Sequence, residues 1–267
     1  DGASTSRSFP AVDALVNLAA MVKGIVGSGV SVTYAADWSE YHHTDGGWYH
    51  MDKLWASPNI DMVGIDAYFP LSDAPQSALG YDVALVKAGW SSGEGYDWYY
   101  TDSGRTTQAA LGAAYAWKNI DWWWNHTHTN PDGNTTQWVA NSKPIWFTEF
   151  GFPSVDGATN QPNVFYDPTS SESFFPYHSQ GRVDFRAQRT GIAATLAQWG
   201  ASNMVTRMFV WTWDARPYPY WPDLTDVWAD GAVWKTGHWV QGKFGISGLG
   251  AIIENLCARA GLDASLV

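Results

Sequence analysis

Carboxylate side chains follow several short apolar runs, at the positions where the strands of a sheet would end. Asp37 follows VTYAA, Asp66 lies within VGIDAYF, Glu149 follows PIWFT, and Asp214 follows VWTW. Hydrolysis of a glycosidic bond needs two carboxyl groups, one acting on the anomeric carbon and one on the leaving oxygen. We therefore expect glycoside hydrolysis at these strand ends, with Glu149 as the strongest catalytic candidate.

Aromatic residues accompany these carboxylates in unusual number. The 267 residues include 18 Trp, 13 Tyr and 11 Phe. A flat aromatic ring can stack on a sugar ring, although packing in the core is the commoner use of any single Trp. The residues that we expect to bind substrate lie at or just after the strand ends: Trp38, Tyr68, Trp146, Trp211, Trp213, Asp214 and Arg216.

Other interpretations of the same residues stay open. Glu149 could form a purely structural ion pair with Arg207 or Arg216, because carboxylates also occur in structural networks. The histidines at 42, 43 and 50 match no common zinc spacing, so we expect no metal there, and either substrate contacts or a solvated loop. No G-x-G-x-x-G or P-loop motif is present, and we expect no cofactor.

Composition excludes several classes of protein. The formal net charge of −11, with 15 Lys and Arg against 26 Asp and Glu, makes nucleic-acid binding improbable. A single Cys allows neither an intrachain disulfide nor a thiolate zinc site. No apolar run approaches the roughly 20 residues of a membrane span, so we expect no membrane insertion. The start of the chain does not resemble a signal peptide.

The elements that would position the carboxylates alternate between helix and strand. Apolar runs predict buried strands over residues 30–36, 61–69, 143–151 and 207–214. Helical spacing of apolar residues predicts helices over residues 10–26, 50–56, 106–125, 182–199 and 249–260. Two further segments, 71–104 and 152–181, are predicted to be long loops because they are rich in Gly, Ser, Asp, Asn and Pro.

This alternation indicates an α/β fold with a parallel sheet. In a (β/α)8, TIM-barrel-like fold all strands end at one mouth, which would bring the four carboxylates together. An open, doubly wound sheet is the competing arrangement, because it also collects polar residues at its strand ends. We expect the barrel, as a single domain over residues 1–267.

Five segments resemble one known family, the TIM-barrel-like domain of gene transfer agents, which also occurs in large tail-tip or hub proteins of related phages. The resemblance is carried by YAADWSEY (34–41), YHMDKLWASPNIDMVGIDAYFPLSD (49–73), SKPIWFTEFGFPSVDGATNQPNVFYDPTSSES (142–173), WDARPYPYWPD (213–223) and VWADGAVWKTGHW (227–239). It implies a glycoside-hydrolase-like barrel on a virus-like tail particle that faces the bacterial envelope. The implied partners are a bacterial polysaccharide and other tail or baseplate proteins.

The resemblance also implies roles for the carboxylates. Retaining barrel glycosidases place the nucleophile Glu after the seventh strand and the acid/base Glu after the fourth, which makes Glu149 the nucleophile. The predicted strands would then be the fifth to the eighth, and the chain would be a fragment that lacks the N-terminal strands and the acid/base residue. Alternatively the strand numbering is wrong, and Asp37, Glu40 or Asp66 serves as the acid.

A function of a different class also fits the sequence, namely a non-catalytic glycan-binding or structural module of a tail tip. The form of the barrel mouth distinguishes between the two functions. An open groove lined by Trp favours sugar binding, whereas a mouth filled by the 71–104 and 152–181 loops favours a scaffold.

Overall fold

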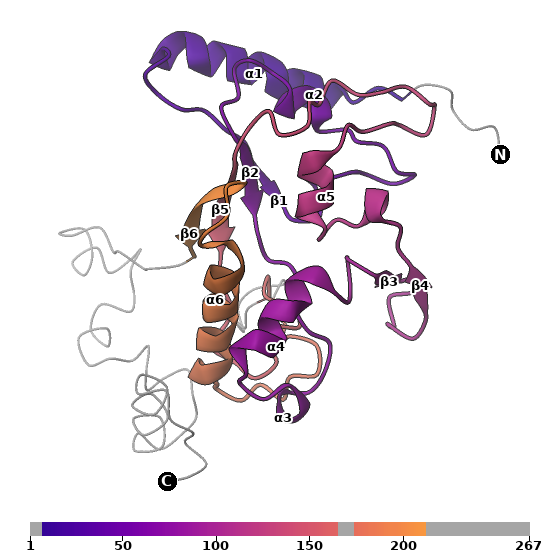
Figure 1. The fold of residues 1–267 in the computed structure, drawn as a ribbon, viewed down its shortest axis with the longest axis vertical. Coiled ribbons are helices and arrows are strands. Elements are labelled where there is room, and N and C mark those ends of the chain that lie inside the picture. The colour runs from indigo at the N-terminus through magenta and orange to yellow at the C-terminus, as the bar shows by residue number, and fades with distance from the viewer. Residues whose placement is uncertain (1–6, 165–173, 212–267) are drawn as a thin grey trace, which may run out of the picture.

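A computed structural model describes residues 7–164 and 174–211 of the chain. The described part combines helices with two sheets (Figure 1). The α-helices are α1 (Pro10–Val26), α2 (Asp52–Trp55), α3 (Gln76–Leu79), α4 (Val83–Ala88), α5 (Ile120–Asn125) and α6 (Phe185–Trp199). The strands are β1 (Ala35–Asp37), β2 (Val63–Asp66), β3 (Trp98–Tyr100), β4 (Gln108–Ala110), β5 (Ile145–Phe150) and β6 (Val205–Val210). Two short 3₁₀ helices are η1 (Gly89–Ser91) and η2 (Ala113–Tyr115).

The main sheet contains four parallel strands in the order β1-β2-β5-β6. This order follows the chain without reversal. A doubly wound sheet reverses its strand order at a switch point, whereas a barrel continues in one direction. The order therefore favours the barrel-type arrangement, although the sheet does not close into a barrel within the described residues. The remaining strands, β3 and β4, pair with each other as an antiparallel hairpin.

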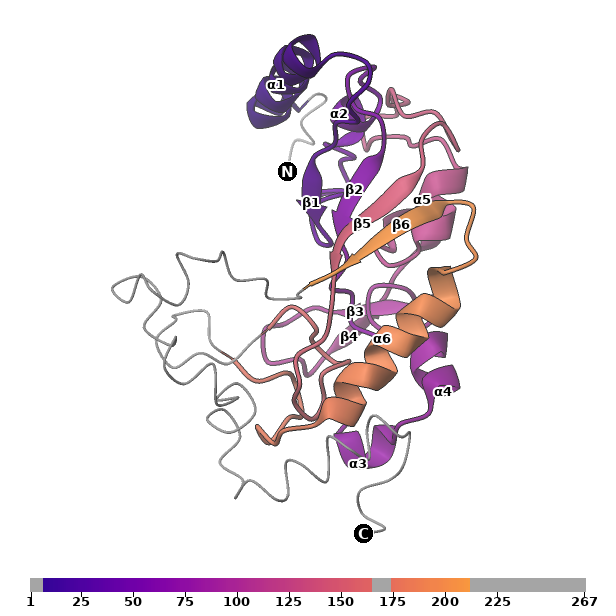
Figure 2. The same ribbon diagram turned by 90° about the vertical axis from the view of Figure 1, so that its left-hand side faces the viewer.

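Helices α4 and α6 lie side by side along one face of the main sheet (Figure 2). Strand residues on this face are buried, including Ile65 and Phe147. The ring of Phe147 stacks on Trp90 at 5.9 Å and meets the edge of Trp199 at 5.9 Å. Large aromatic side chains thus fill the space between sheet and helices, where burial of their apolar area stabilises the fold.

The opposite face of the sheet carries the polar residues that alternate with this core. Gly64 and Asp66 of β2 alternate with buried Val63 and Ile65, as the two-residue period of a strand requires. Trp146 occupies the register position beside Gly64 on β5. Asp66 and Trp146, which the sequence predicts as site residues, therefore lie on the side of the sheet opposite Ile65 and Phe147.

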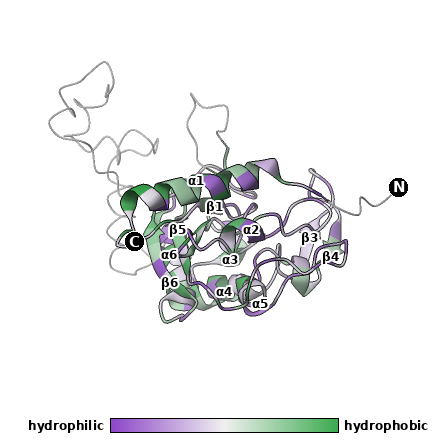
Figure 3. Cartoon of the chain, turned by 90° about the horizontal axis from the view of Figure 1, so that it is seen from above, coloured by the Kyte–Doolittle hydropathy of each residue, from purple (hydrophilic) through white to green (hydrophobic). Residues whose placement is uncertain are grey.

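Helix α1 lies across one end of the sheet (Figure 1), and several of its residues are coloured as hydrophobic in Figure 3. Pro10 occupies the first turn, where its missing N–H costs nothing. Met21 is 65% exposed and Ile25 82% exposed, whereas Val12 and Ala19 are buried. Leu18 and Val26 of the same helix are also exposed, so α1 presents several apolar residues to solvent.

Most predicted elements are present, but several differ in extent. Helix α1 has the bounds that the sequence predicts, residues 10–26. The strand predicted over 30–36 is shorter in the structure, where β1 comprises only Ala35–Asp37. The helix predicted over 106–125 is wrong for its first part, since Gln108–Ala110 forms β4 and only Ile120–Asn125 is α-helical. The helix predicted over 249–260 lies outside the described residues.

Candidate functional site

Three of the four predicted carboxylates lie side by side at the carboxyl ends of neighbouring strands. In the parallel register Asp37 of β1 is opposite Asp66 of β2, and Asp66 is opposite Glu149 of β5. We call these three residues the carboxylate row. Adjacent strands of a sheet are about 4.8 Å apart, so the row concentrates negative charge in a short line. The fourth residue, Asp214, lies outside the described residues.

A bulge in the pairing of β2 with β5 sets the direction of Glu149. Ile65 is opposite Phe147 and Asp66 is opposite Glu149, so Thr148 is an extra residue on β5. The Thr148 hydroxyl donates a hydrogen bond of 2.7 Å to Oδ1 of Asp66. Bulges next to functional sites commonly redirect one side chain in this way.

Gly151 allows the ends of β5 and β6 to approach closely beside the row. A Cβ atom on Gly151 would lie 2.1 Å from the carbonyl oxygen of Trp211. The backbone N–H of Trp211 donates to the carbonyl of Phe150 at 2.8 Å. Any larger residue at 151 would separate these strand ends, so the glycine is required by the approach of the backbone.

Tyr68 fixes the carboxylate of Glu149. Its hydroxyl donates a hydrogen bond of 2.7 Å to Oε2 of Glu149. Burial raises the pKa of Tyr68, and the hydrogen bond and charge of Glu149 raise it further. Tyr68 therefore keeps its proton near neutral pH and acts as a hydrogen-bond donor. The hydrogen bond from Tyr68 is made to Oε2 and leaves Oε1 as the second oxygen of this carboxylate.

Asp66 is the carboxyl group of the row whose surroundings favour the protonated form. Burial raises the pKa of Asp66, and the charges of Glu149, Asp37 and Glu40 raise it further against the opposing hydrogen bond from Thr148. Each neighbouring negative charge makes ionisation of a carboxyl group less favourable. At the edge of the row, Oδ1 of Asp37 accepts hydrogen bonds from the backbone N–H and the hydroxyl of Ser39.

The predicted sugar-binding residues lie at different places around the row. Trp38 follows Asp37 and its ring meets the edge of Phe69 at 5.9 Å. The indole of Trp146 donates to the hydroxyl of Thr206, and the Arg207 guanidinium lies 4.8 Å from its ring centroid. No ion pair joins Arg207 to Glu149, both of which the structure describes. Trp211 is 59% exposed. The remaining predicted residues, Trp213 and Arg216, lie outside the described residues.

A cleft of about 990 Å³ opens beside Trp38. Its walls come from the segment after β1, from Tyr99 of β3 and from the segment that leads through η2 to Trp117. Three lining residues were not among the binding residues predicted from the sequence: Tyr99, Tyr115 and Trp117. The sequence does show many aromatic residues over 96–117, which could have indicated a binding surface. The incorrect prediction of a helix over 106–125 gave no reason to expect that these residues meet in space.

Two of the histidines near this cleft, His42 and His43, lie against each other. No group of three or more metal-ligating side chains occurs among the residues that the structure describes. His42 is fully buried, and its Nδ1 lies 2.8 Å from Nδ1 of His43, so one imidazole donates and the other accepts. The expectation of a solvated loop is wrong for His42, because the ring packs against Tyr49 and Trp123.

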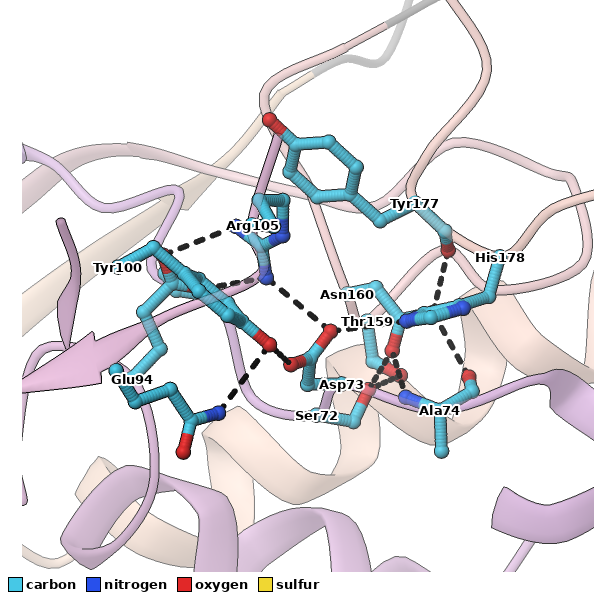
Figure 4. Close-up of polar contacts among 12 residues, drawn as sticks. Ser72, Asp73, Ala74, Glu94, Tyr100, Arg105, Thr159, Asn160, Tyr177 and His178 are labelled. Carbon is cyan, nitrogen blue, oxygen red and sulfur yellow. Dashed lines mark hydrogen bonds and ion pairs between the residues drawn. The ribbon is translucent and has the colours of Figure 1, made fainter. Parts of the chain in front are cut away.

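The prediction of a long loop over 71–104 is wrong, because this segment contains α3, α4, η1 and β3. Contacts around Arg105 attach it to the second segment, 152–181 (Figure 4). The Arg105 guanidinium binds both oxygens of Glu94 and one oxygen of Asp73, at 2.8 to 3.1 Å. The guanidinium also lies between the rings of Tyr100 and Tyr177, at 4.1 and 3.8 Å from their centroids. Tyr177 belongs to the second segment and the other partners to the first, so Arg105 joins the two.

A second contact, made by the Asn160 side chain, joins the same segments. Its Oδ1 accepts from the Ser72 hydroxyl at 2.6 Å, and its Nδ2 donates to the carbonyls of Ala74 and Tyr177. Figure 4 shows Asn160 between these partners. The segments thus form one hydrogen-bonded assembly, and the cleft stays open beside it.

Comparison with known families decides how this architecture is classified. The family described as GTA TIM-barrel-like domain matches residues 2–222. The chain belongs to this family. The fold predicted from the sequence is thereby confirmed, and the four consecutive parallel strands are part of a TIM-barrel-like architecture. No curated protein matches the chain. None of the described helices of this GTA TIM-barrel-like domain is long and apolar enough to cross a membrane.

Proposed function

We propose that this GTA TIM-barrel-like domain is a retaining glycoside hydrolase that acts on a bacterial cell-envelope polysaccharide as part of a gene transfer agent or phage-like tail. The observation that carries the proposal is the carboxylate row, with Glu149 held by Tyr68 next to Asp66. Paired carboxyl groups at the carboxyl ends of barrel strands are the arrangement that glycoside hydrolysis requires.

In the first step Oε1 of Glu149 attacks the anomeric carbon. The bond from this carbon to the leaving oxygen breaks, and the leaving oxygen takes a proton from an acid. In the second step water attacks the same carbon, the acid residue takes the proton of the water, and Glu149 leaves as a carboxylate. Within the described residues Asp66 is the carboxyl group best suited to hold the proton, because its surroundings raise its pKa.

The alternative function is a non-catalytic glycan-binding or structural module of the tail tip. The contacts of Arg105 and Asn160 favour it, because they join the two long segments into a rigid assembly such as a scaffold requires. The open cleft favours glycan engagement under either function.

Incubation with purified peptidoglycan, capsular polysaccharide and exopolysaccharide tests the proposal. We expect the wild-type protein to release new reducing ends from one of them, and Glu149→Gln to reduce the rate by about 10³-fold or more, since the amide cannot act as a nucleophile. Asp61→Asn is the control, because Asp61 contacts Lys23 away from the row. Release at the wild-type rate by Glu149→Gln, or no release by the wild type from any of the three, would contradict the proposal.

A further inference from the structure

We infer that the cleft beside the carboxylate row binds an uncharged segment of glycan, in preference to an acidic one. The inference deepens the proposed function, on which its biological meaning rests, by naming the substrate class. It is carried by the shape, the aromatic lining and the charge of the cleft, which are independent of whether the row is catalytic.

The size and the lining of the cleft fit a sugar chain. Its volume of about 990 Å³ is at the upper end of the range for small-molecule sites, which is about 300–1,000 Å³. Four aromatic residues contribute to its walls: Trp38, Tyr99, Tyr115 and Trp117. Tyr99 is 36% exposed and Tyr115 40% exposed, so their rings are accessible to a ligand. Aromatic side chains offer an apolar face together with a polar edge, which suits the mixed surface of a sugar ring.

Two glycines hold the aromatic rings of the cleft in place. A Cβ atom on Gly47 would lie 2.6 Å from the Tyr115 ring, and one on Gly95 would lie 2.7 Å from the Trp117 indole. Both glycines have positive φ values, +83° and +79°, which other residues rarely adopt. The rings therefore lie directly against the backbone, and their positions are fixed before a ligand arrives, which lowers the entropic cost of binding.

The charges of the cleft oppose an acidic ligand. Of the residues that the structure describes, Glu40 and Asp45 belong to the lining, and no Lys or Arg does. Arg7 lies near the edge, where its guanidinium donates to the backbone carbonyl of Asp45 at 2.8 Å. A uronate or phosphate group in the cleft would meet two carboxylates without a lining cation to compensate it, and would be repelled.

The two histidines of the lining suit an uncharged ligand. Burial lowers the pKa of His43 and of His50, so both imidazoles are neutral at pH 7. A neutral imidazole has one nitrogen that donates and one that accepts a hydrogen bond. Hydroxyl groups of a sugar can use either kind of partner, so a neutral glycan fits this lining without a charge to balance.

The lining of the cleft begins next to one end of the carboxylate row. Trp38 of the lining directly follows Asp37, and the backbone N–H of Glu40, also in the lining, donates to the Asp37 carbonyl at 2.8 Å. The charge of Glu40 contributes to the raised pKa of Asp66, which places the cleft within electrostatic reach of the row. A glycan in the cleft would therefore extend toward Glu149.

Titration calorimetry with defined hexasaccharides tests the inference. The neutral probes are hexamers of N-acetylglucosamine, glucose, mannose and galactose, and the acidic probe is hexagalacturonate. We expect at least one neutral hexamer to bind and hexagalacturonate to bind at least about tenfold more weakly. Tyr99→Ala combined with Tyr115→Ala should weaken neutral binding by about tenfold, because a few residues, among which Trp and Tyr are enriched, carry most of the energy of a binding surface.

Two further variants and a comparison with the hydrolysis assay separate the possible failures. Phe174→Ala removes an exposed ring outside the cleft lining and should bind like the wild type. Binding and hydrolysis are measured separately on the wild type, so a protein that binds a neutral hexamer but releases no reducing ends contradicts the proposed function and not the inference. Glu40→Gln with Asp45→Asn should strengthen binding of hexagalacturonate. Equal binding of acidic and neutral probes, no binding of any neutral hexamer, or unchanged binding by the folded double tyrosine variant would overturn the inference.

Discussion

Single hydrogen bonds determine how the central carboxylates of the row point. Tyr68 binds one oxygen of Glu149, and Thr148 binds one oxygen of Asp66. The two donors come from different places, since Tyr68 follows β2 and Thr148 is the extra residue of the bulge in β5. Each carboxylate is thus oriented by the neighbouring strand, and the pair depends on the register of the sheet.

A buried histidine makes stability depend on pH. Burial lowers the pKa of His42 well below 6.5, and the nearby His43, His128 and His50 lower it further. The unfolded chain therefore takes up a proton at His42 below about pH 6.5, whereas the folded protein does so only at lower pH. The contribution of neutral His42 to the free energy of unfolding is therefore fully present above about pH 6.5. It is lost as the pH falls below this value.

Denaturant titrations at pH 7 and pH 5 measure this effect. His42→Phe keeps an aromatic ring in contact with Tyr49 and removes the titrating group. We expect the free energy of unfolding of the variant to fall by about 1 kcal/mol less between the two pH values than that of the wild type. Equal losses in both proteins would show that His42 is protonated in the folded state at pH 5.

At the scale of elements, the close approach of β5 and β6 predicts the effect of a single methyl group. Gly151→Ala would place Cβ against the Trp211 carbonyl, so we expect the free energy of unfolding to fall by about 1–3 kcal/mol. Gly24→Ala is the matched control, because Gly24 lies in α1 with open space around it. This control should be neutral or stabilising by up to about 1 kcal/mol. Thermal or chemical denaturation measures both, and equal stability of the two variants would contradict the described packing.

The sequence predicts best those elements whose pattern is local. Helix α1 and strand β5 were predictable because their apolar residues follow one period over many residues. The segment Gln108–Ala110 has helix-forming alanines, yet it forms β4 because it pairs with Trp98–Tyr100. That partner lies ten residues away across a turn, and its contribution outweighs the intrinsic preference of Ala.

The candidate site was predictable to the same degree. Asp37, Asp66 and Glu149 each follow an apolar run, so their shared edge could be inferred from the parallel sheet. The donors Tyr68 and Thr148 could not be assigned, because their contacts depend on a bulge that leaves no mark in the sequence. The cleft likewise depends on contacts between segments that are distant in the chain.

At the scale of the whole molecule, the two faces of the main sheet differ in the residues that they carry. One face holds the aromatic core against α4 and α6, and the other face and the carboxyl ends carry the carboxylate row. The lining of the cleft includes Trp38, which directly follows Asp37 at the end of β1. This division, in consecutive parallel strands of a TIM-barrel-like domain, leaves the residues at the carboxyl ends of the strands free to vary while the core maintains the fold.

Chemical rescue of Glu149→Ala tests the central claim, that Glu149 is the nucleophile, most directly. The alanine leaves space in which azide can attack the anomeric carbon of the polysaccharide that the wild type cleaves. We predict that Glu149→Ala is inactive in buffer, and that sodium azide restores turnover with formation of a glycosyl azide of inverted configuration, detected by mass spectrometry and NMR. Turnover by Glu149→Ala at the wild-type rate without azide, or no azide-dependent product, would contradict the account.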